Sequence, residues 1–269
     1  MQQLEAFTNP VSKPKTGLAN WDNAIGDLLP GHLYVLMSMP ACGKTAFCLN
    51  IAVHNCAAPI ELPVLYINPA VATIQIINRL IACASGISYR HVWDNEFSAQ
   101  DWGHIRDSLD FLVDIEQRFN HIGSTQCSIS NLEETLSSLD ANNKPGLIII
   151  DDADLRYLGV QLPVDELLDF SELKQLAKKF NVPILFAANI ELTDNNDDIT
   201  IIQRAHQQYD TLFEADCILA LHQPDNDPFE PEESDAELGR KLVAEVLFTK
   251  LGYETEVDVV FYPELQQFQ

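Results

Sequence analysis

Basic residues are scarce in this sequence: 16 Lys and Arg stand against 40 Asp and Glu, for a formal net charge of −24. Proteins bind nucleic acid mainly by neutralising its phosphates with Lys and Arg. Because no cluster of basic residues interrupts the acidic balance, we expect weak or no nucleic-acid binding. The simplest interpretation of the charge is solubility, and the alternative is attraction to a basic protein partner.

Long apolar runs and metal-type cysteine spacings are missing as well. No apolar run is long enough to span a bilayer, and the polar stretch Met1–Lys15 lacks the pattern of a secretory signal. We therefore expect a cytoplasmic globular protein without membrane contact, built as one large domain or two small ones. Its six cysteines occur mostly within apolar runs, which predicts buried thiols in a reducing cytosol. The cysteines are Cys42, Cys48, Cys56, Cys83, Cys127 and Cys217.

The stretch Leu33–Ala52 predicts a buried strand, a tight loop and the first turns of a helix. The loop ends in Gly43-Lys44-Thr45, as a phosphate-binding P-loop does. Gly43 lets the backbone approach a phosphate because no Cβ stands in the way, and a helix N-terminus favours an anion. Lys44 can then reach the β- and γ-phosphates, while the Thr45 hydroxyl can bind Mg²⁺.

The strict P-loop pattern fails at its first position, where Ser38 stands in place of glycine. The surroundings nevertheless support the motif, because Leu147–Asp151 is a second apolar run that ends in an acid. Such an acid holds Mg²⁺ in P-loop proteins, so Asp151 is the second expected metal ligand. The alternatives are an ordinary strand-to-helix turn and a vestigial loop that its bulky neighbours block. The predicted nucleotide-binding residues of the loop are Ser38, Pro40, Ala41, Cys42, Gly43, Lys44 and Thr45.

Strand and helix patterns alternate along the chain, which predicts an α/β fold with a mostly parallel, twisted sheet and helices on both faces. We expect a flexible tail over residues 1–15 and a single domain over 16–269, with acidic loops at about 191–200 and 223–237. Predicted helices cover 45–56, 72–84, 98–117, a stretch that opens with a capping box at Ser130, and 164–180. Predicted strands, besides the one before the P-loop, cover 63–68, 147–151, 182–188, 216–221, 242–249 and 255–262.

These segments together resemble the motor domain of DnaB-type hexameric replicative helicases, which is a RecA-like P-loop domain. That family commonly replaces the first P-loop glycine and has a proline where Pro40 stands, so Ser38 fits its pattern. The resemblance implies ATP or ADP with Mg²⁺ as the ligand, a role in DNA replication, and a homo-oligomer or ring. The segments that carry it are Thr16-Gly-Leu18, Leu29-Pro-Gly31, Pro40–Ala52, Asp101-Trp102, Leu147–Asp151, Leu173–Pro183 and Glu214-Ala-Asp216.

The sequence departs from the family at the catalytic base. A glutamate that activates the attacking water is expected in the segment Asn68-Pro-Ala-Val71, and the matching residue is Ala70. Alanine has no proton acceptor, and the loss of general-base help lowers a rate by about 10²–10⁴. Asp152 or Asp154 could take over this role.

Three further positions come from the same resemblance. The residue that senses the γ-phosphate, a glutamine in the family, matches Asn189. Family members also present a lysine and an arginine finger to the neighbouring subunit. The lysine is retained as Lys250, but Gly252 stands where the arginine is expected. Such a finger accelerates phosphoryl transfer by about 10³–10⁵ in other systems.

We therefore predict a catalytically degenerate, nucleotide-binding relative of these helicases that acts through a protein partner. The expected partners are a helicase, its loader or another basic replication protein. One alternative is an active ATP-dependent helicase motor, and another is an acidic mimic of DNA. The loops expected to face DNA are 155–165 and 191–200. They contain a single basic residue, Arg156, and several acidic residues, and this charge balance opposes DNA binding.

Overall fold

The computed structural model describes residues 13–40, 42–123, 129–140, 144–151, 169–190, 203, 211–223, 239–250 and 255–269. Over these residues a nine-stranded sheet has the order β3-β2-β4-β5-β1-β6-β7-β8-β9. The strands are β1 (Leu33–Ser38), β2 (Val64–Ile67), β3 (Phe119–Ile122), β4 (Leu147–Asp151), β5 (Ile184–Asn189), β6 (Cys217–His222), β7 (Arg240–Thr249), β8 (Thr255–Tyr262) and β9 (Gln267–Phe268). The helices are α2 (Ala19–Ile25), α3 (Lys44–Cys56), α4 (Thr73–Ser85), α5 (Tyr89–Asp94), α6 (Ala99–Glu116), α7 (Ile129–Ser138), α8 (Phe170–Phe180) and the 3-10 turn η3 (Leu212–Glu214).

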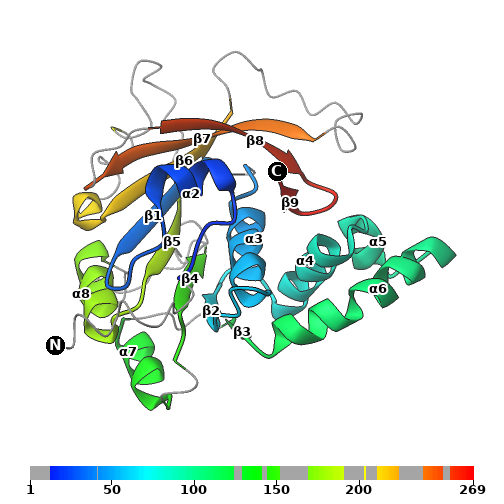
Figure 1. The fold of residues 1–269 in the computed structure, drawn as a ribbon, viewed down its shortest axis with the longest axis horizontal. Coiled ribbons are helices and arrows are strands. Elements are labelled where there is room, and N and C mark those ends of the chain that lie inside the picture. The colour runs from blue at the N-terminus through cyan, green and yellow to red at the C-terminus, as the bar shows by residue number, and fades with distance from the viewer. Residues whose placement is uncertain are drawn as a thin grey trace.

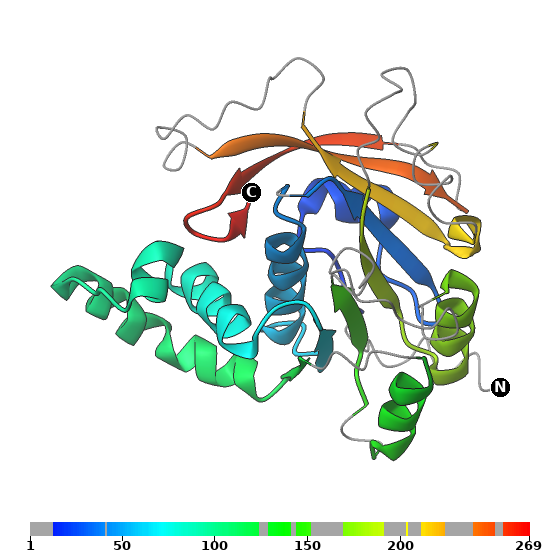
Figure 2. The same ribbon diagram turned by 180° about the vertical axis from the view of Figure 1, so that it is seen from behind.

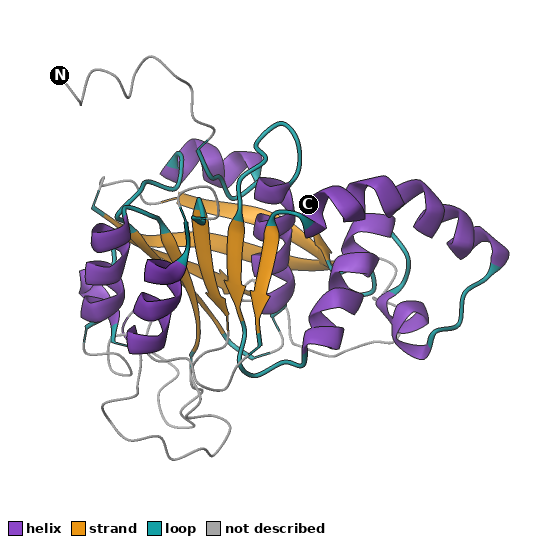
Figure 3. Cartoon of the chain, turned by 90° about the horizontal axis from the view of Figure 1, so that it is seen from below, coloured by secondary structure: helices purple, strands orange, loops and turns teal. Residues whose placement is uncertain are grey.

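The sheet is parallel from β3 to β6 and antiparallel from β6 to β9. Helices cover both of its faces, with α3 on one side and α7 and α8 on the other (Figures 1 and 3). The predicted α/β class, with its mostly parallel sheet, is therefore confirmed. Helices α4, α5 and α6 extend beyond α3, away from the sheet (Figure 2).

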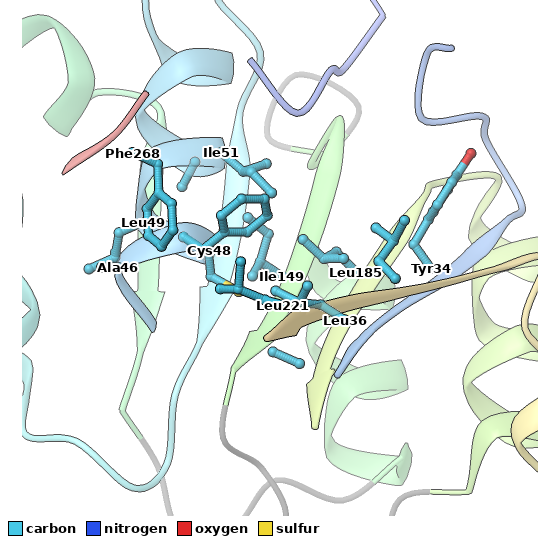
Figure 4. Close-up of a cluster of buried hydrophobic side chains, with 14 of the residues drawn as sticks. Tyr34, Leu36, Ala46, Cys48, Leu49, Ile51, Ile149, Leu185, Leu221 and Phe268 are labelled. Atoms are coloured by element: carbon cyan, nitrogen blue, oxygen red, sulfur yellow. The ribbon is translucent and has the colours of Figure 1, made fainter. Parts of the chain in front are cut away.

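Successive residues of the central strand β1 face opposite cores, as the pleat of a strand requires. Leu36 belongs to the core on the α3 side, together with Leu49 of α3 (Figure 4). Val35 and Met37 belong to the core under α8. Because both faces are covered, β1 is buried along its whole length, which explains its continuous apolar sequence.

Helix α3 is also covered by the end of the chain. Asn50 donates from Nδ2 to the Gln266 carbonyl at 2.7 Å and accepts from the Phe268 amide at 3.2 Å. The Phe268 ring meets the Phe47 ring edge-on, with 5.0 Å between centroids, and stacks on Phe261 of β8 at 4.6 Å. The two-residue strand β9 is therefore fixed by contacts with α3, far away in the sequence.

Most predicted elements are confirmed within one or two residues, and two helix starts are corrected. The helix predicted to open at Ser130 exists, but Ser130 lies inside α7, which already includes Ile129. The helix predicted from 164 begins at Phe170, because Asp169 is extended and its carboxylate caps the Ser171 amide at 2.7 Å. Residues 164–168 lie outside the described residues. Five short elements of the described chain, α2, α5, β3, η3 and β9, were not predicted.

The described end of the predicted tail contacts the domain. The Lys15 amide donates to Asn55 Oδ1 at 3.0 Å, and the Pro14 carbonyl accepts from the Leu28 amide at 2.8 Å. Residues 1–12 of that segment, and all of the predicted acidic loops except Gln223, lie outside the described residues. Across the described part of the chain, no helix combines the length and apolar character that a membrane span requires.

Buried thiols are confirmed for five cysteines, none of which forms a disulfide bond within the described residues, while Cys127 lies outside the described ranges. Burial raises the pKa of Cys83 to about 11. It raises the pKa of Cys56 and of Cys217 to about 12. These thiols therefore stay protonated at neutral pH and act as small apolar residues.

Candidate nucleotide-binding site

The turn between β1 and α3 depends on glycine at position 43. Gly43 is the N-cap residue of α3 and has a left-handed backbone, with φ 82° and ψ 16°. A Cβ there would lie 2.7 Å from Cε1 of Phe261, so both the backbone angle and the space favour glycine. The amides of the first helical turn then remain available for an anion, as in other phosphate-binding helix N-termini.

The P-loop lysine lies beside the residue predicted to sense the γ-phosphate. Lys44 is 7% exposed, and its Nζ donates to Asn189 Oδ1 at 2.8 Å. Parallel pairing of β1 with β5 brings Asn189 opposite Ser38, and the Ser38 carbonyl accepts from the Ile190 amide at 3.0 Å. The sheet register therefore places the predicted sensor within reach of the predicted lysine.

Asp151 ends β4 with its side chain fully buried. Its Oδ2 accepts from Tyr66 Oη at 2.8 Å and from Asn68 Nδ2 at 2.7 Å. Burial, followed by the charge of Asp151, raises the pKa of Tyr66 well above its ordinary value, so the phenol remains a donor. Both donors come from β2 and the turn after it, and sequence analysis missed them. Their only signal was that β2 and β4 both lead to the same edge of a parallel sheet.

Ala70 lies in the turn that Asn68 shapes. Asn68 Oδ1 accepts from the Ala70 amide at 3.0 Å and from the Val71 amide at 2.9 Å, as an Asx turn does. The same side chain therefore connects the turn to Asp151. The Ala70 methyl group offers no proton acceptor at the position where the family resemblance predicts a glutamate.

Cys42 fills the P-loop and is 8% exposed. Burial raises the pKa of its thiol, while the positive charges of Lys44 and Arg240 act in the opposite direction. Because burial prevails, the thiol stays protonated at neutral pH. Its chemistry therefore suits a small loop filler better than a reactive nucleophile.

Lys250 lies at the other end of the central strand from the P-loop. Its Nζ is 3.2 Å from Asp216 Oδ1 and 3.2 Å from the Glu214 carbonyl. The Asp216 carboxylate in turn accepts from the amide of Leu33, the first residue of β1, at 2.8 Å. The P-loop follows Ser38, the last residue of β1, which is about 17 Å further along. Lys250 is thus remote from Lys44 of its own chain.

Lys174, which sequence analysis did not single out as a site residue, forms a buried ion pair with the same Asp216. Its Nζ also donates to the Gly31 carbonyl at 2.7 Å. Burial by itself would raise the pKa of Asp216, but hydrogen bonds from Lys174 and Leu33 outweigh that effect and lower the pKa. This group of charges stabilises the amino end of β1.

The structure thus brings together Ser38, Cys42, Gly43, Lys44 and Asn189 at the carboxyl edge of the sheet. Asp151 ends β4 at the same edge. Pro40 lies in the loop after β1, and Thr45 lies in the first turn of α3. A nucleotide with Mg²⁺ fits this arrangement, because the cradle at Gly43 has no room for a Cβ and Lys44 is held among strand ends. Ala41, Asp152, Asp154 and Gly252 lie outside the described residues.

This combination of sheet, loop and strand-end acid defines the chain as a P-loop protein with a RecA-like fold. The family model for the DnaB-like helicase C terminal domain matches residues 14–269. The chain therefore belongs to the DnaB-like helicase C-terminal domain family.

Curated relatives and solved structures agree with this family. "Replicative DNA helicase DnaB" of Buchnera aphidicola subsp. Baizongia pistaciae (strain Bp) is 24% identical over 241 residues, covering 87% of this chain and 50% of the relative. "Replicative DNA helicase DnaC" of Bacillus subtilis (strain 168) is 20% identical over 276 residues, covering 100% and 59%. The chain thus spans about half the length of these curated relatives.

Among solved structures, the "ATPase Domain of G40P" is similar with a TM-score of 0.75 and 17% identity, covering 99% of this chain and 94% of that one. A structure described as a DnaB-like replicative helicase and its interactions with primase has a TM-score of 0.69 and 16% identity, covering 99% and 64%. At these identities the likeness establishes the fold.

Proposed function

We propose that this chain binds ATP or ADP with Mg²⁺ at the P-loop. The observation that carries the proposal is the placement of Lys44, buried at the start of α3 with its Nζ at 2.8 Å from Asn189 Oδ1. In the proposed complex, Lys44 and the first amides of α3 bind the phosphates. Thr45 and Asp151 bind Mg²⁺, and the bound metal supplies a positive charge on the phosphate oxygens.

In this proposal, the chain hydrolyses the bound ATP only slowly. Ala70, at the position of the expected base, carries no proton acceptor, and its turn is fixed by Asn68. The expected finger position is Gly252, which has no side chain to supply a charge. These two absences act on one transition state, so their effects multiply only in part.

The proposed biological action proceeds through a basic protein partner of the replication machinery, such as a helicase or its loader. Two observations support it: the net charge of −24 and membership in a family of replication proteins. One solved relative is described with primase. Complementary charge would guide the association of an acidic domain with a basic partner.

A second candidate function is an active helicase motor. It is favoured by the P-loop residues Gly43-Lys44-Thr45, by the buried strand-end acid Asp151 and by a family match that spans residues 14–269. Under this reading Asp152 or Asp154 activates the attacking water in place of the missing glutamate.

The test combines nucleotide binding with turnover. Calorimetric titration of ADP with Mg²⁺ should give binding that Lys44→Met abolishes, whereas Lys178→Met, on the exposed end of α8, should bind as the wild type does. Turnover should stay well below about one per second, with or without single-stranded DNA. Absence of ADP binding at millimolar nucleotide would contradict the proposed ligand. Turnover of one per second or more that DNA stimulates would establish the helicase motor instead.

A pull-down of candidate replication proteins at low and high salt tests the partner. If the chain binds its partner through a specific protein interface, it should retain a purified loader or helicase as the salt concentration rises. If it acts as a mimic of DNA, its binding to all basic partners should fall steeply with salt.

A further inference from the structure

One positively charged residue near the P-loop has no role in the function proposed so far. Arg240 is the first residue of β7 and lies directly opposite Phe261 in the antiparallel pair of β7 and β8. Residues directly opposite each other in such a pair project from the same face of the sheet, with Cβ atoms about 4.5–5.5 Å apart. The Phe261 ring lies against the P-loop: a Cβ added at Gly43 would be 2.7 Å from Cε1 of Phe261.

The sheet register also places Arg240 beyond the carboxyl end of β1. Ser38 ends β1 opposite Leu221 of β6, and Leu221 pairs with Ala244 of β7. Arg240 lies four residues before Ala244 along β7, which corresponds to about 13 Å beyond that level. The P-loop leaves the sheet at this edge. Figures 1 and 2 show the start of β7 and the end of β8 extending over α3.

Alternation along β7 decides which face Arg240 occupies. Leu242 and Ala244, two and four residues further on, belong to the core packed against α3. With the side-chain period of two, Arg240 projects from this same face. Lys241 projects from the opposite face and is exposed. Of these two neighbouring basic residues, Arg240 therefore points toward the start of α3 and Lys241 points away from it.

We propose that Arg240 binds the polyphosphate of the nucleotide from within the same chain. The inference rests on the proposed nucleotide-binding function and adds a residue to that site. A guanidinium is always charged and offers donors in a planar fork that matches phosphate oxygens. The charge of Arg240 already acts on this loop, because it opposes the effect of burial on the pKa of Cys42.

The proposed contact would favour the bound nucleotide more than its hydrolysis. A charge that meets the phosphates before the reaction binds the ground state and the transition state alike, which raises affinity without raising the rate. Arg240 is thus a binding residue rather than a substitute for the finger expected at Gly252. The chain would retain ADP or ATP tightly while turning it over slowly.

The test measures the affinity of ADP and AMP for the full chain and three variants. Arg240→Ala should weaken ADP binding about 10- to 100-fold, the range for a charge-assisted hydrogen bond, and should weaken AMP binding less. Arg240→Lys should recover part of the ADP affinity, because the charge remains. Lys241→Ala is the matched control and should bind ADP as the wild type does. Thermal unfolding of each variant checks that the fold is intact.

The outcomes separate the two proposals. If the wild type binds ADP and folded Arg240→Ala binds it equally well, or if Lys241→Ala loses as much affinity, the role of Arg240 is refuted and the nucleotide site remains. An equal loss for AMP and ADP refutes the contact with the polyphosphate. If the wild type itself binds no ADP at millimolar concentration, the proposed function fails and the inference fails with it.

Discussion

Replacing Asp216 by asparagine should destabilise the fold while leaving nucleotide affinity unchanged. The side chain is buried, accepts from the Leu33 amide at 2.8 Å and forms an ion pair with Lys174, which is 7% exposed. Asparagine preserves the shape but removes the charge opposite Lys174. Breaking a buried ion pair by removing one partner costs about 3–5 kcal/mol. For a domain of this size the loss corresponds to about 6–20 °C in melting temperature.

The same substitution should remove part of the acid sensitivity of the fold. The pKa of Asp216 is lowered in the folded chain, because hydrogen bonds from Lys174 and Leu33 outweigh burial. Stability from this carboxylate is therefore fully present above the unfolded pKa of about 4 and is lost as pH falls through the lower folded value. Asp216→Asn should show a smaller loss of stability over that acid range.

Urea unfolding at pH 7 and at several acid values, with ADP titration at pH 7, measures both effects. Lys250→Ala is the matched control: its Nζ contacts the same carboxylate at 3.2 Å, but the side chain is 47% exposed. Exposed pairs contribute about 1 kcal/mol or less. An Asp216→Asn variant as stable as the wild type, or one that loses ADP affinity while still folded, would refute this account of the amino end of β1.

Three further predictions concern the P-loop and the reaction. Gly43→Ala should abolish ADP binding in calorimetry and lower the melting temperature. Alanine is strained in the left-handed backbone conformation of this position, and its Cβ would clash with the Phe261 ring. Thr45→Ala should weaken the Mg²⁺ dependence of nucleotide binding, measured by titration with and without the metal, more than binding itself. Ala70→Glu and Gly252→Arg should each raise ATP turnover little, and together more than the sum of their separate effects. Equal rates for the double variant and the wild type would contradict this explanation of slow turnover.

The parts of the fold that could be predicted from the sequence are those with strong local patterns. The helix predicted over 98–117 is present as α6, and Ser98 and Asp101 form a capping box with reciprocal contacts at its start. Strand β3, Phe119–Ile122, has no comparable signal, because it is four residues long and its side chains are half-buried or exposed. Such an edge strand forms because its parallel neighbour, β2, offers unpaired backbone groups.

The candidate site divides in the same way. A local motif is enough to predict Gly43, Lys44 and Thr45, because the loop and the helix start are contiguous in the chain. Contacts across the sheet are not contained in any local pattern. The Tyr66 hydroxyl meets Asp151 only because β2 and β4 pair in a particular register. Likewise, Phe261 meets Gly43 only because the antiparallel extension of the sheet returns over the P-loop.

The position of Lys250 bears on where hydrolysis can occur. Lys44 begins α3 at the carboxyl end of β1, whereas Lys250 is held by Asp216 at the amino end of the same strand. A side chain cannot cross the roughly 17 Å length of that strand to reach the phosphates of its own chain. If Lys250 serves the reaction, as the family resemblance implies, it must serve a nucleotide held by a second copy. Binding then requires one chain and efficient turnover requires an assembly, so the affinity of a nucleotide and its rate of hydrolysis need not change together.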